Sequence, residues 1–229
     1  MSLTVSLNVA CHPFKVAARV RIPLRVPQRV QDLLVAQLIR TKRLALHLIE
    51  ADDLICLFEK PNDLSIYVNK PFTNPHRVLV DDPGPLRWRV PQVKEDPKLN
   101  VWFVRWVVLS STNEIVGSIS FHAMPDAEGM IEIGIEIHPD FQNNGYAKEA
   151  LLGMWIWVID QPGVKTLRYT VAAQNLPSVK IVSSFGFKHV GQQIDEEDGP
   201  EEIFEMDACQ RRSKTEHFQR SKSEQFRSI

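Results

Sequence analysis

The chain has 229 residues, of which 44% are hydrophobic and 24% charged, as expected for one globular domain with additional terminal segments. No run approaches about 18 apolar residues, so we expect no membrane-spanning helix, and three scattered cysteines argue against a disulfide framework. The formal net charge of −1 hides basic ends and an acidic middle, and the scattered thiols indicate a reducing compartment, hence a cytoplasmic location.

The first 39 residues are predicted to be an N-terminal extension that is partly helical. Residues 1–24 have no clear period, whereas 28–39 gather apolar side chains near one face and predict a helix. Residues 43–48 predict a strand, and 51–60 predict a helix. Seven prolines between positions 61 and 98 exclude a long regular element there.

Three strands of a meander are predicted next, over 101–109, 114–123 and 131–137. In the third strand Glu132, Gly134 and Glu136 share one face. Two carboxylates on one face of a central strand suit a cleft that receives an ammonium group, with Glu132 or Glu136 as general base. The alternative is a partly solvated face whose glutamates pair with Arg105 or Arg168. Gly134 is expected to leave room for a ligand or a bulge.

The third strand runs into a tight turn that opens a helix, with the sequence Gln142-Asn143-Asn144-Gly145-Tyr146-Ala147. Successive backbone N–H groups at a helix N-terminus form an anion site suited to a pyrophosphate, and Gly145 lets the backbone approach a ligand. The alternative is an ordinary strand-to-helix connection. A strand over 166–172 and a second helix opened by Asn175 and Ser178 are predicted to follow.

The order of these segments resembles the GCN5-related N-acetyltransferase (GNAT) family. The Q-x-x-G-x-A pattern at 142–147, after a strand ending in His-Pro, is similar to its motif A. The N-x-x-S helix that begins at Asn175 and ends in Gly186-Phe187 is similar to its second cofactor segment. Residues 40–46, RTKRLAL, resemble the first strand of the branch that modifies ribosomal-protein N-termini, the RimJ/RimL-like branch.

The resemblance implies an α/β (α+β) fold: a mixed, mainly antiparallel sheet flanked by helices and splayed at the motif A strand. It implies an N-acetyltransferase domain over 40–207, followed by a basic tail, 208–229, that we expect to be disordered. Acetyl-coenzyme A is the implied cosubstrate, with no metal. Its implied binding residues are Ile135, Ile137, Gln142, Asn143, Asn144, Gly145, Tyr146, Ala147 and Asn175.

The implied reaction is direct acetyl transfer to a primary amine. Many family members supply the general acid from a tyrosine at the position of Val182, so Ser178 is the implied substitute, with a helix-capping hydroxyl as its alternative role. An acidic residue near Glu196 or Glu197 is a further candidate base. His122 ends a strand that could face the cleft, but a lone histidine is more often a structural residue.

The acceptor is predicted to be either a protein N-terminus or a small-molecule amine of the antibiotic or polyamine type. The alternative function is a non-catalytic acyl-coenzyme A binding module. We expect no membrane or nucleic-acid partner, and both a monomer and a homodimer are compatible with the sequence.

Overall fold

The computed structural model describes residues 4–5, 20–21, 38–195 and 199–209. The chain divides into two compact units, residues 1–37 and 38–229. In the first unit, β1 (Thr4–Val5) pairs with β2 (Val20–Arg21) in antiparallel fashion. The predicted helix over 28–39 lies outside the described residues up to position 37. Its last two positions were assigned wrongly, because they pair with the following strand and belong to β3 (Leu38–Arg40).

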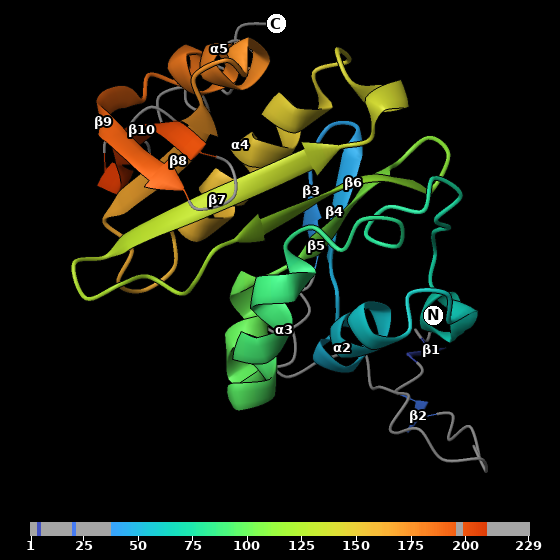
Figure 1. The fold of residues 1–229 in the computed structure, drawn as a ribbon. Coiled ribbons are helices and arrows are strands. Elements are labelled where there is room, and N and C mark those ends of the chain that lie inside the picture. Colours follow the sequence, from blue (N-terminus) through green and yellow to red (C-terminus); the bar gives the residue numbers. More distant parts are fainter. Residues whose placement is uncertain (1–3, 6–19, 22–37, 196–198, 210–229) are drawn as a thin grey trace, which may run out of the picture. The chain divides into compact units, whose positions relative to one another are not determined.

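The second unit is built on an eight-stranded sheet with the order β3-β4-β5-β6-β7-β8-β10-β9 (Figure 1). All neighbouring strands are antiparallel except β7 and β8. The remaining strands are β4 (Leu44–Leu48), β5 (Arg105–Leu109), β6 (Glu114–Phe121), β7 (Met130–Ile137), β8 (Thr166–Ala172), β9 (Lys188–Asp195) and β10 (Gly199–Asp207). This topology confirms the predicted mixed, mainly antiparallel sheet.

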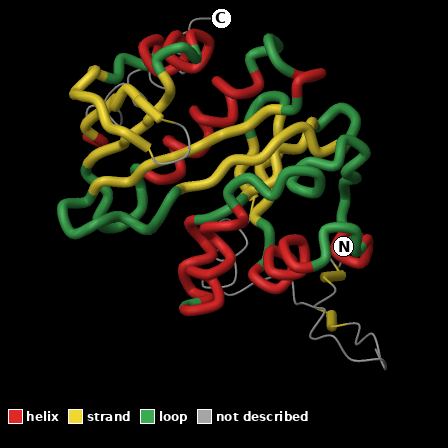
Figure 2. Tube along the Cα trace, viewed as in Figure 1, coloured by secondary structure: helices red, strands yellow, loops and turns green. Residues whose placement is uncertain are grey.

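Apolar side chains alternate along the central strands, so each face of the sheet carries a core. Leu44, Leu46 and Val107 belong to one core, which includes residues of α4 (Tyr146–Val158) and α5 (Leu176–Ser184). Ala45 and Trp106 belong to the other core, with residues of α2 (Ala51–Glu59) and α3 (Leu86–Glu95). Helices therefore flank both faces, as predicted (Figure 2).

The proline-rich segment contains more regular structure than predicted. It forms the 3-10 helix η1 (Leu64–Tyr67) and the ten-residue helix α3, with Pro91 inside the helix. Leu86, Val90 and Val93 on α3 are buried in the core, and we attribute the survival of the helix to this burial, which offsets the hydrogen bond that Pro91 cannot donate. Strand β5 begins at Arg105 rather than at 101, because Pro97–Trp102 form the 3-10 helix η2.

β7 and β8 pair with each other over only three residues each. Met130, Ile131 and Glu132 pair with Thr166, Leu167 and Arg168, and the ladder ends there, whereas β7 continues along β6 to Ile137. In the part of the chain that the structure describes, the edge of β7 beyond Glu132 thus has no strand partner on its β8 side. This confirms the predicted splay. The bulge considered at Gly134 is absent, because the β6–β7 register is continuous from Phe121–Ile133 to Gly117–Ile137.

Candidate active site

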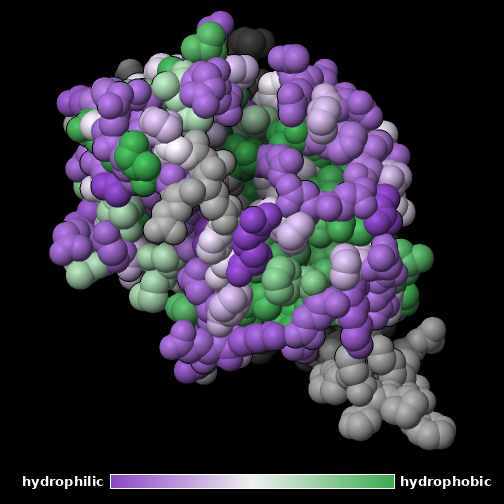
Figure 3. Space-filling view, in the orientation of Figure 1, coloured by the Kyte–Doolittle hydropathy of each residue, from purple (hydrophilic) through white to green (hydrophobic). Residues whose placement is uncertain are grey.

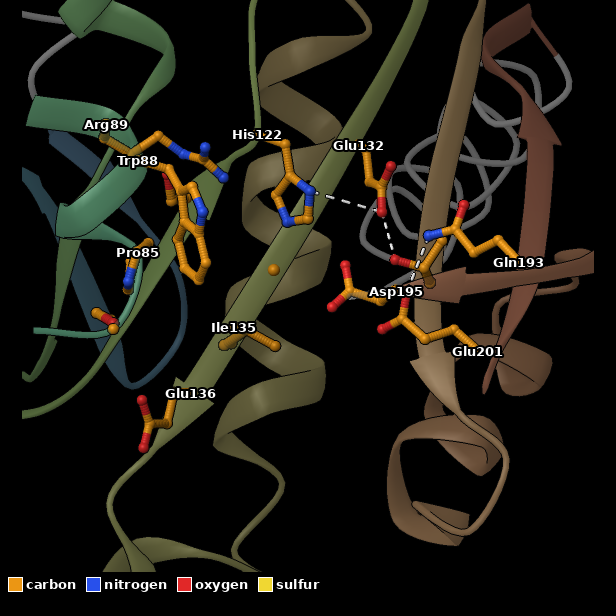
Figure 4. A pocket seen from close by; sticks show the side chains of 15 residues that line it. Pro85, Trp88, Arg89, His122, Glu132, Ile135, Glu136, Gln193, Asp195 and Glu201 are labelled. Atoms are coloured by element: carbon orange, nitrogen blue, oxygen red, sulfur yellow. Dashed lines mark hydrogen bonds and ion pairs between the residues drawn. The ribbon is translucent and has the colours of Figure 1, made fainter. Parts of the chain in front are cut away.

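A pocket of about 590 Å³ lies where β7 separates from β8 (Figure 4). Its lining comes from α3 and the loop before it, from β6 to β8, and from the β9–β10 hairpin. The lining residues are Gly84, Pro85, Trp88, Arg89, Ser118, Ser120, His122, Glu132, Gly134, Ile135, Glu136, Thr170, Gln193, Asp195 and Glu201. The face seen in Figure 3 is mainly hydrophilic, with apolar residues visible between the polar ones. Carboxylates are the commonest charged groups of this lining.

Glu132, Gly134 and Glu136 all line the pocket, as their shared strand face predicts. The β6–β7 register sets Ser120 opposite Gly134 and Ser118 opposite Glu136. Arg168, one of the two arginines considered as partners of these glutamates, pairs instead with Glu205 of β10, with 2.6 Å between nitrogen and oxygen. The guanidinium of Arg105, the other one, lies 5.0 Å from the ring centroid of Trp157.

The carboxylate of Glu132 contacts Thr170 and His122. Thr170 Oγ1 donates a hydrogen bond to Glu132 Oε1, and His122 Nδ1 lies 3.6 Å from the same oxygen (Figure 4). The side chain of Glu132 is 16% exposed. Glu132 is therefore held in place from two neighbouring strands and faces the pocket, where a carboxylate can accept a proton.

His122 lines the pocket, which is the cleft-facing position that the sequence left open beside a structural role. A Cβ at Gly134 would come within 3.1 Å of His122 Nε2, so the glycine makes room for the imidazole. Burial, with Arg89 nearby, lowers the pKa of His122 to about 4, and the ring is neutral at neutral pH. Ser118 and Ser120 on β6 and His122 directly after it alternate along the chain, which places all three side chains on this face.

Arg89 reaches the pocket from α3, and sequence reasoning did not identify it. Its side chain is buried, and its Nε has no hydrogen-bond partner among the described residues. Burial lowers the pKa of Arg89 to about 10 although Glu132 acts to raise it, so the guanidinium is charged at neutral pH. At another part of the lining, partial burial and Asp82 raise the pKa of Glu136.

The predicted phosphate turn follows β7 and the 3-10 helix η3 (Pro139–Phe141). Asn143 and Gly145 have positive φ angles of 60° and 77°, a conformation that asparagine and glycine adopt most readily. Gly145 is the N-cap of α4, and Tyr146 and Ala147 form its first turn. The first N–H groups of a helix have no partner within the helix, so the turn offers donors to an anion.

The amide side chains of the turn bind its own backbone. Asn144 Nδ2 donates to the carbonyl oxygens of Phe141 and Gln142, at 3.2 and 2.9 Å. Gln142 Nε2 donates to the carbonyl oxygen of Ile137 at 2.9 Å. The Ile137 carbonyl, predicted to pair with the cosubstrate, thus already accepts one hydrogen bond and retains one lone pair. Ile135 lies in the pocket lining.

Arg43 and Glu149 clamp the turn to the first strands, a contact absent from our sequence analysis. Glu149 accepts hydrogen bonds from Thr41 Oγ1 and Arg43 N at 2.6 Å, and from Arg43 Nε at 2.7 Å. Arg43 Nη1 donates to the Asn144 carbonyl at 3.0 Å, and its guanidinium lies 4.6 Å from the Tyr146 ring centroid. Partial burial alone would raise the pKa of Glu149, but the bonds from Thr41 and Arg43 hold it below its ordinary value.

Asn175 caps helix α5, since its Oδ1 accepts a hydrogen bond from Ser178 N at 3.3 Å. The capping role considered for the Ser178 hydroxyl therefore belongs to Asn175. The Ser178 hydroxyl lies near the phenol of Tyr169, where it counters part of the increase in pKa that burial gives this phenol. Ser178 is not among the lining residues of the pocket that holds Glu132. Val182 is fully buried in the core, so this position directs no side chain to the cleft.

His76, His138 and Asp140 form a group of metal-ligating side chains within the described residues, with ligand atoms within 4.8 Å of one another. None of the three lines the pocket, and His138 Nδ1 already accepts a hydrogen bond from the Asp140 backbone N–H at 3.4 Å. The expected absence of a metal requirement stays a prediction.

Three further expectations concern the chain outside the pocket. Within the described ranges, no helix has the length and apolar character needed to cross a membrane. Cys56 and Cys209 form no disulfide among the described residues, in line with the prediction of no disulfide framework. Cys11, Glu196, Glu197 and the tail from residue 210 onward lie outside the described residues.

Comparison with known proteins identifies the family of this chain. Residues 43–188 match the family described as acetyltransferase (GNAT) domain. The uncharacterized N-acetyltransferase YjdG of Bacillus subtilis (strain 168) is 33% identical over 86 residues, which cover 37% of this chain and 51% of YjdG. The chain thus spans about half the length of this curated relative.

Solved structures share the fold at lower identity. The ribosomal-protein-S5-alanine acetyltransferase from Vibrio fischeri superimposes with a TM-score of 0.54 at 15% identity, covering 75% of this chain and 96% of that chain. The Microcin C7 self immunity acetyltransferase MccE, solved in complex with acetyl-CoA and AMP, gives a TM-score of 0.50 at 17% identity, covering 72% and 93%. At such identities the likeness establishes the fold.

Proposed function

The chain belongs to the acetyltransferase (GNAT) family, and we propose that it transfers the acetyl group of acetyl-coenzyme A to a primary amine. One observation carries the proposal. β7 leaves β8 beyond Glu132, and the pocket at this separation contains Glu132 on the same strand that leads, through η3, to the Gly145 turn. A single strand thus joins a candidate proton acceptor to a candidate phosphate site.

The described residues fit an extended cosubstrate with a pyrophosphate. Among the described residues, the edge of β7 from Ile133 to Ile137 has no strand partner on its β8 side, and it can pair with the amide groups of an extended chain. A Cβ at Gly145 would lie 3.5 Å from Arg43 Nη2 and would be strained at φ 77°, so a side chain would narrow this turn. Acetyl-coenzyme A bound here supplies an activated acetyl group.

Each catalytic candidate then has a stated task. Glu132 accepts the proton that an acceptor ammonium must lose, directly or through the neutral imidazole of His122, and Thr170 orients its carboxylate. Glu136 is the second candidate base. Ser178, near Tyr169 in the first turn of α5, is the candidate that holds the proton required by the leaving sulfur.

Two classes of acceptor remain in the proposal, a protein N-terminus and a small-molecule amine of the antibiotic or polyamine type. A non-catalytic acyl-coenzyme A binding module is the alternative function, and the buried Val182 at the position of the common family tyrosine supports it. A thiol-release assay with a panel of amines and N-terminal peptides separates these possibilities, because a binding module releases no coenzyme A with any acceptor.

The role of Glu132 is tested by comparing Glu132→Gln with Glu136→Gln. General-base catalysis is worth roughly 100- to 10,000-fold, so Glu132→Gln is expected to lose at least about 100-fold in turnover at neutral pH while keeping acetyl-coenzyme A affinity. Activity should recover partly at higher pH, where free amine accumulates. Superimposable pH–rate profiles for wild type and Glu132→Gln would assign the role to Glu136 or to a residue outside this pair.

The turn is tested by calorimetric titration of Gly145→Val with acetyl-coenzyme A. We expect a large loss of affinity, because valine is strained at positive φ and adds a side chain at the phosphate site. Unchanged affinity in a folded Gly145→Val protein would remove the turn from the cosubstrate site.

A further inference from the structure

The charges that line the pocket are not all of one sign. Glu132, Glu136, Asp195 and Glu201 contribute carboxylates from β7 and the β9–β10 hairpin, whereas Arg89 contributes a guanidinium from α3. Figure 4 shows Arg89 and Glu132 on opposite sides of His122. The pocket therefore presents a cationic group on the side of α3 and anionic groups across from it.

Arg89 is held in this position at an energetic cost. Only 7% of its surface is exposed, and its Nε is buried with no hydrogen-bond partner among the described residues. A buried charged donor without an acceptor is unfavourable, because it loses water and gains nothing in return. The centroid of the Phe103 ring lies 6.0 Å from the guanidinium carbon, and this ring supplies no hydrogen-bond acceptor to Nε.

Arg89 Nε is closed to solvent, but other atoms of the residue line the pocket, where an anionic oxygen group on a ligand would pair with the charge of its guanidinium. A guanidinium presents a planar fork of N–H donors that matches the two oxygens of a carboxylate. The fork faces a pocket that is large enough for a small molecule and that already contains Glu132 as a partner for an ammonium group. A ligand that carries both groups can satisfy both sides of the pocket at once.

We propose that Arg89 binds a carboxylate of the acceptor, and that the acceptor is an amine that also carries this carboxylate, as in an amino acid. This inference rests on the proposed acetyl transfer and narrows its substrate class. The amine of such an acceptor lies toward Glu132 and His122, its carboxylate lies toward Arg89, and Trp88 forms an apolar wall of the pocket next to it. A polyamine suits the acidic side but places a cation against Arg89.

The test compares amino acids with amines of the same carbon skeleton. L-Leucine is paired with 3-methylbutylamine and L-phenylalanine with 2-phenylethylamine, and the amides of both amino acids form a third arm. The measurement is kcat/KM from coenzyme A thiol release at saturating acetyl-coenzyme A. For the wild type we expect the amino acid to be preferred over the matched amine by at least about tenfold, the ratio that one modest charge-assisted interaction produces.

Arg89→Gln should reduce this preference at least about tenfold, and Arg89→Lys should retain part of it, because lysine keeps the charge but not the fork. Arg87→Gln is the matched control on the same helix: Arg87 pairs with Asp82 at 3.6 Å and does not line the pocket, so the preference should not change. An equal preference in wild type and Arg89→Gln, or a wild type that prefers the amine or the amide, would overturn the inference. A preference for the amide would indicate a peptide N-terminus.

Two further outcomes separate this inference from the proposed function. If Arg89→Gln does not fold, the inference is judged from the wild type alone, by the ratio of kcat/KM for the amino acid to kcat/KM for the matched amine. If no amine of the panel is acetylated although acetyl-coenzyme A binds, acetyl transfer to these acceptors fails. The carboxylate site is then judged by calorimetric binding of N-acetylleucine against N-acetyl-3-methylbutylamine, and the absence of a difference there would refute it.

Discussion

The clamp between Glu149 and Arg43 predicts a stability loss that can be worked from its bonds. Glu149→Gln keeps the size of the side chain but removes its charge, and at least one of the three accepted hydrogen bonds becomes a donor facing a donor. Hydrogen bonds to charged groups contribute about 1.5–3 kcal/mol to stability. The Arg43 side chain is 42% exposed, so its ion pair with Glu149 is screened by water and contributes less. We expect a loss of about 2 kcal/mol in the free energy of unfolding.

The assay is urea denaturation with Glu59→Gln as the matched control. Glu59 also pairs with a basic side chain, Lys94 at 2.5 Å, but both partners are 48% exposed and screened by solvent, so Glu59→Gln should lower the free energy of unfolding much less than Glu149→Gln does. Because Arg43 also holds the Asn144 carbonyl, Glu149→Gln should in addition weaken acetyl-coenzyme A binding about tenfold, which Glu59→Gln should not.

The pH dependence gives the clamp a second test. The pKa of Glu149 is held below its ordinary value of 4.5. Its contribution to the free energy of unfolding is therefore present above pH 4.5 and is lost as the pH falls through the lowered pKa. Wild type and Glu149→Gln should therefore converge in stability in acid. If Glu149→Gln and Glu59→Gln lose the same free energy of unfolding at neutral pH, and neither changes the affinity for acetyl-coenzyme A, the contacts of Glu149 with Arg43 do not stabilise the turn.

Three further predictions concern other groups. Ser178→Ala should lower turnover more than acetyl-coenzyme A affinity in kinetic and calorimetric measurements, and an unchanged turnover would exclude the serine as the general acid. Burial, helped by nearby basic side chains, lowers the pKa of His47 from 6.5 to about 4, so the unfolded chain takes up a proton first and stability falls as the pH drops from 6.5 toward 4. Urea titrations should show a shallower fall for His47→Gln, and an identical fall would contradict the assignment. Dialysis against a chelator should leave turnover unchanged, and a loss restored by zinc would instead implicate His76 and its neighbours.

Local patterns in the sequence determined much of this fold. A side chain in a strand has a period of two, so the residues Glu132, Gly134 and Glu136 had to share a face wherever the strand lay. The turn around Gly145 was readable because a positive φ selects glycine there. The order of strands and helices followed from periodicity and from the punctuating glycines and prolines.

The partners of these residues were decided by the tertiary structure, since they come from distant segments. Thr170 meets Glu132 because β8 lies beside β7, and Arg43 meets Glu149 across a separation of 106 residues. The prolines argued against a regular element where α3 lies. The helix forms nevertheless, because burial of its apolar face outweighs the unfavourable helix propensity of Pro91. Arg89 reached the pocket by the same route: its helix is anchored by the core, and only that packing sets its guanidinium opposite Glu132. Local chemistry thus specified the elements, whereas strand pairing and burial, which are non-local, specified the site.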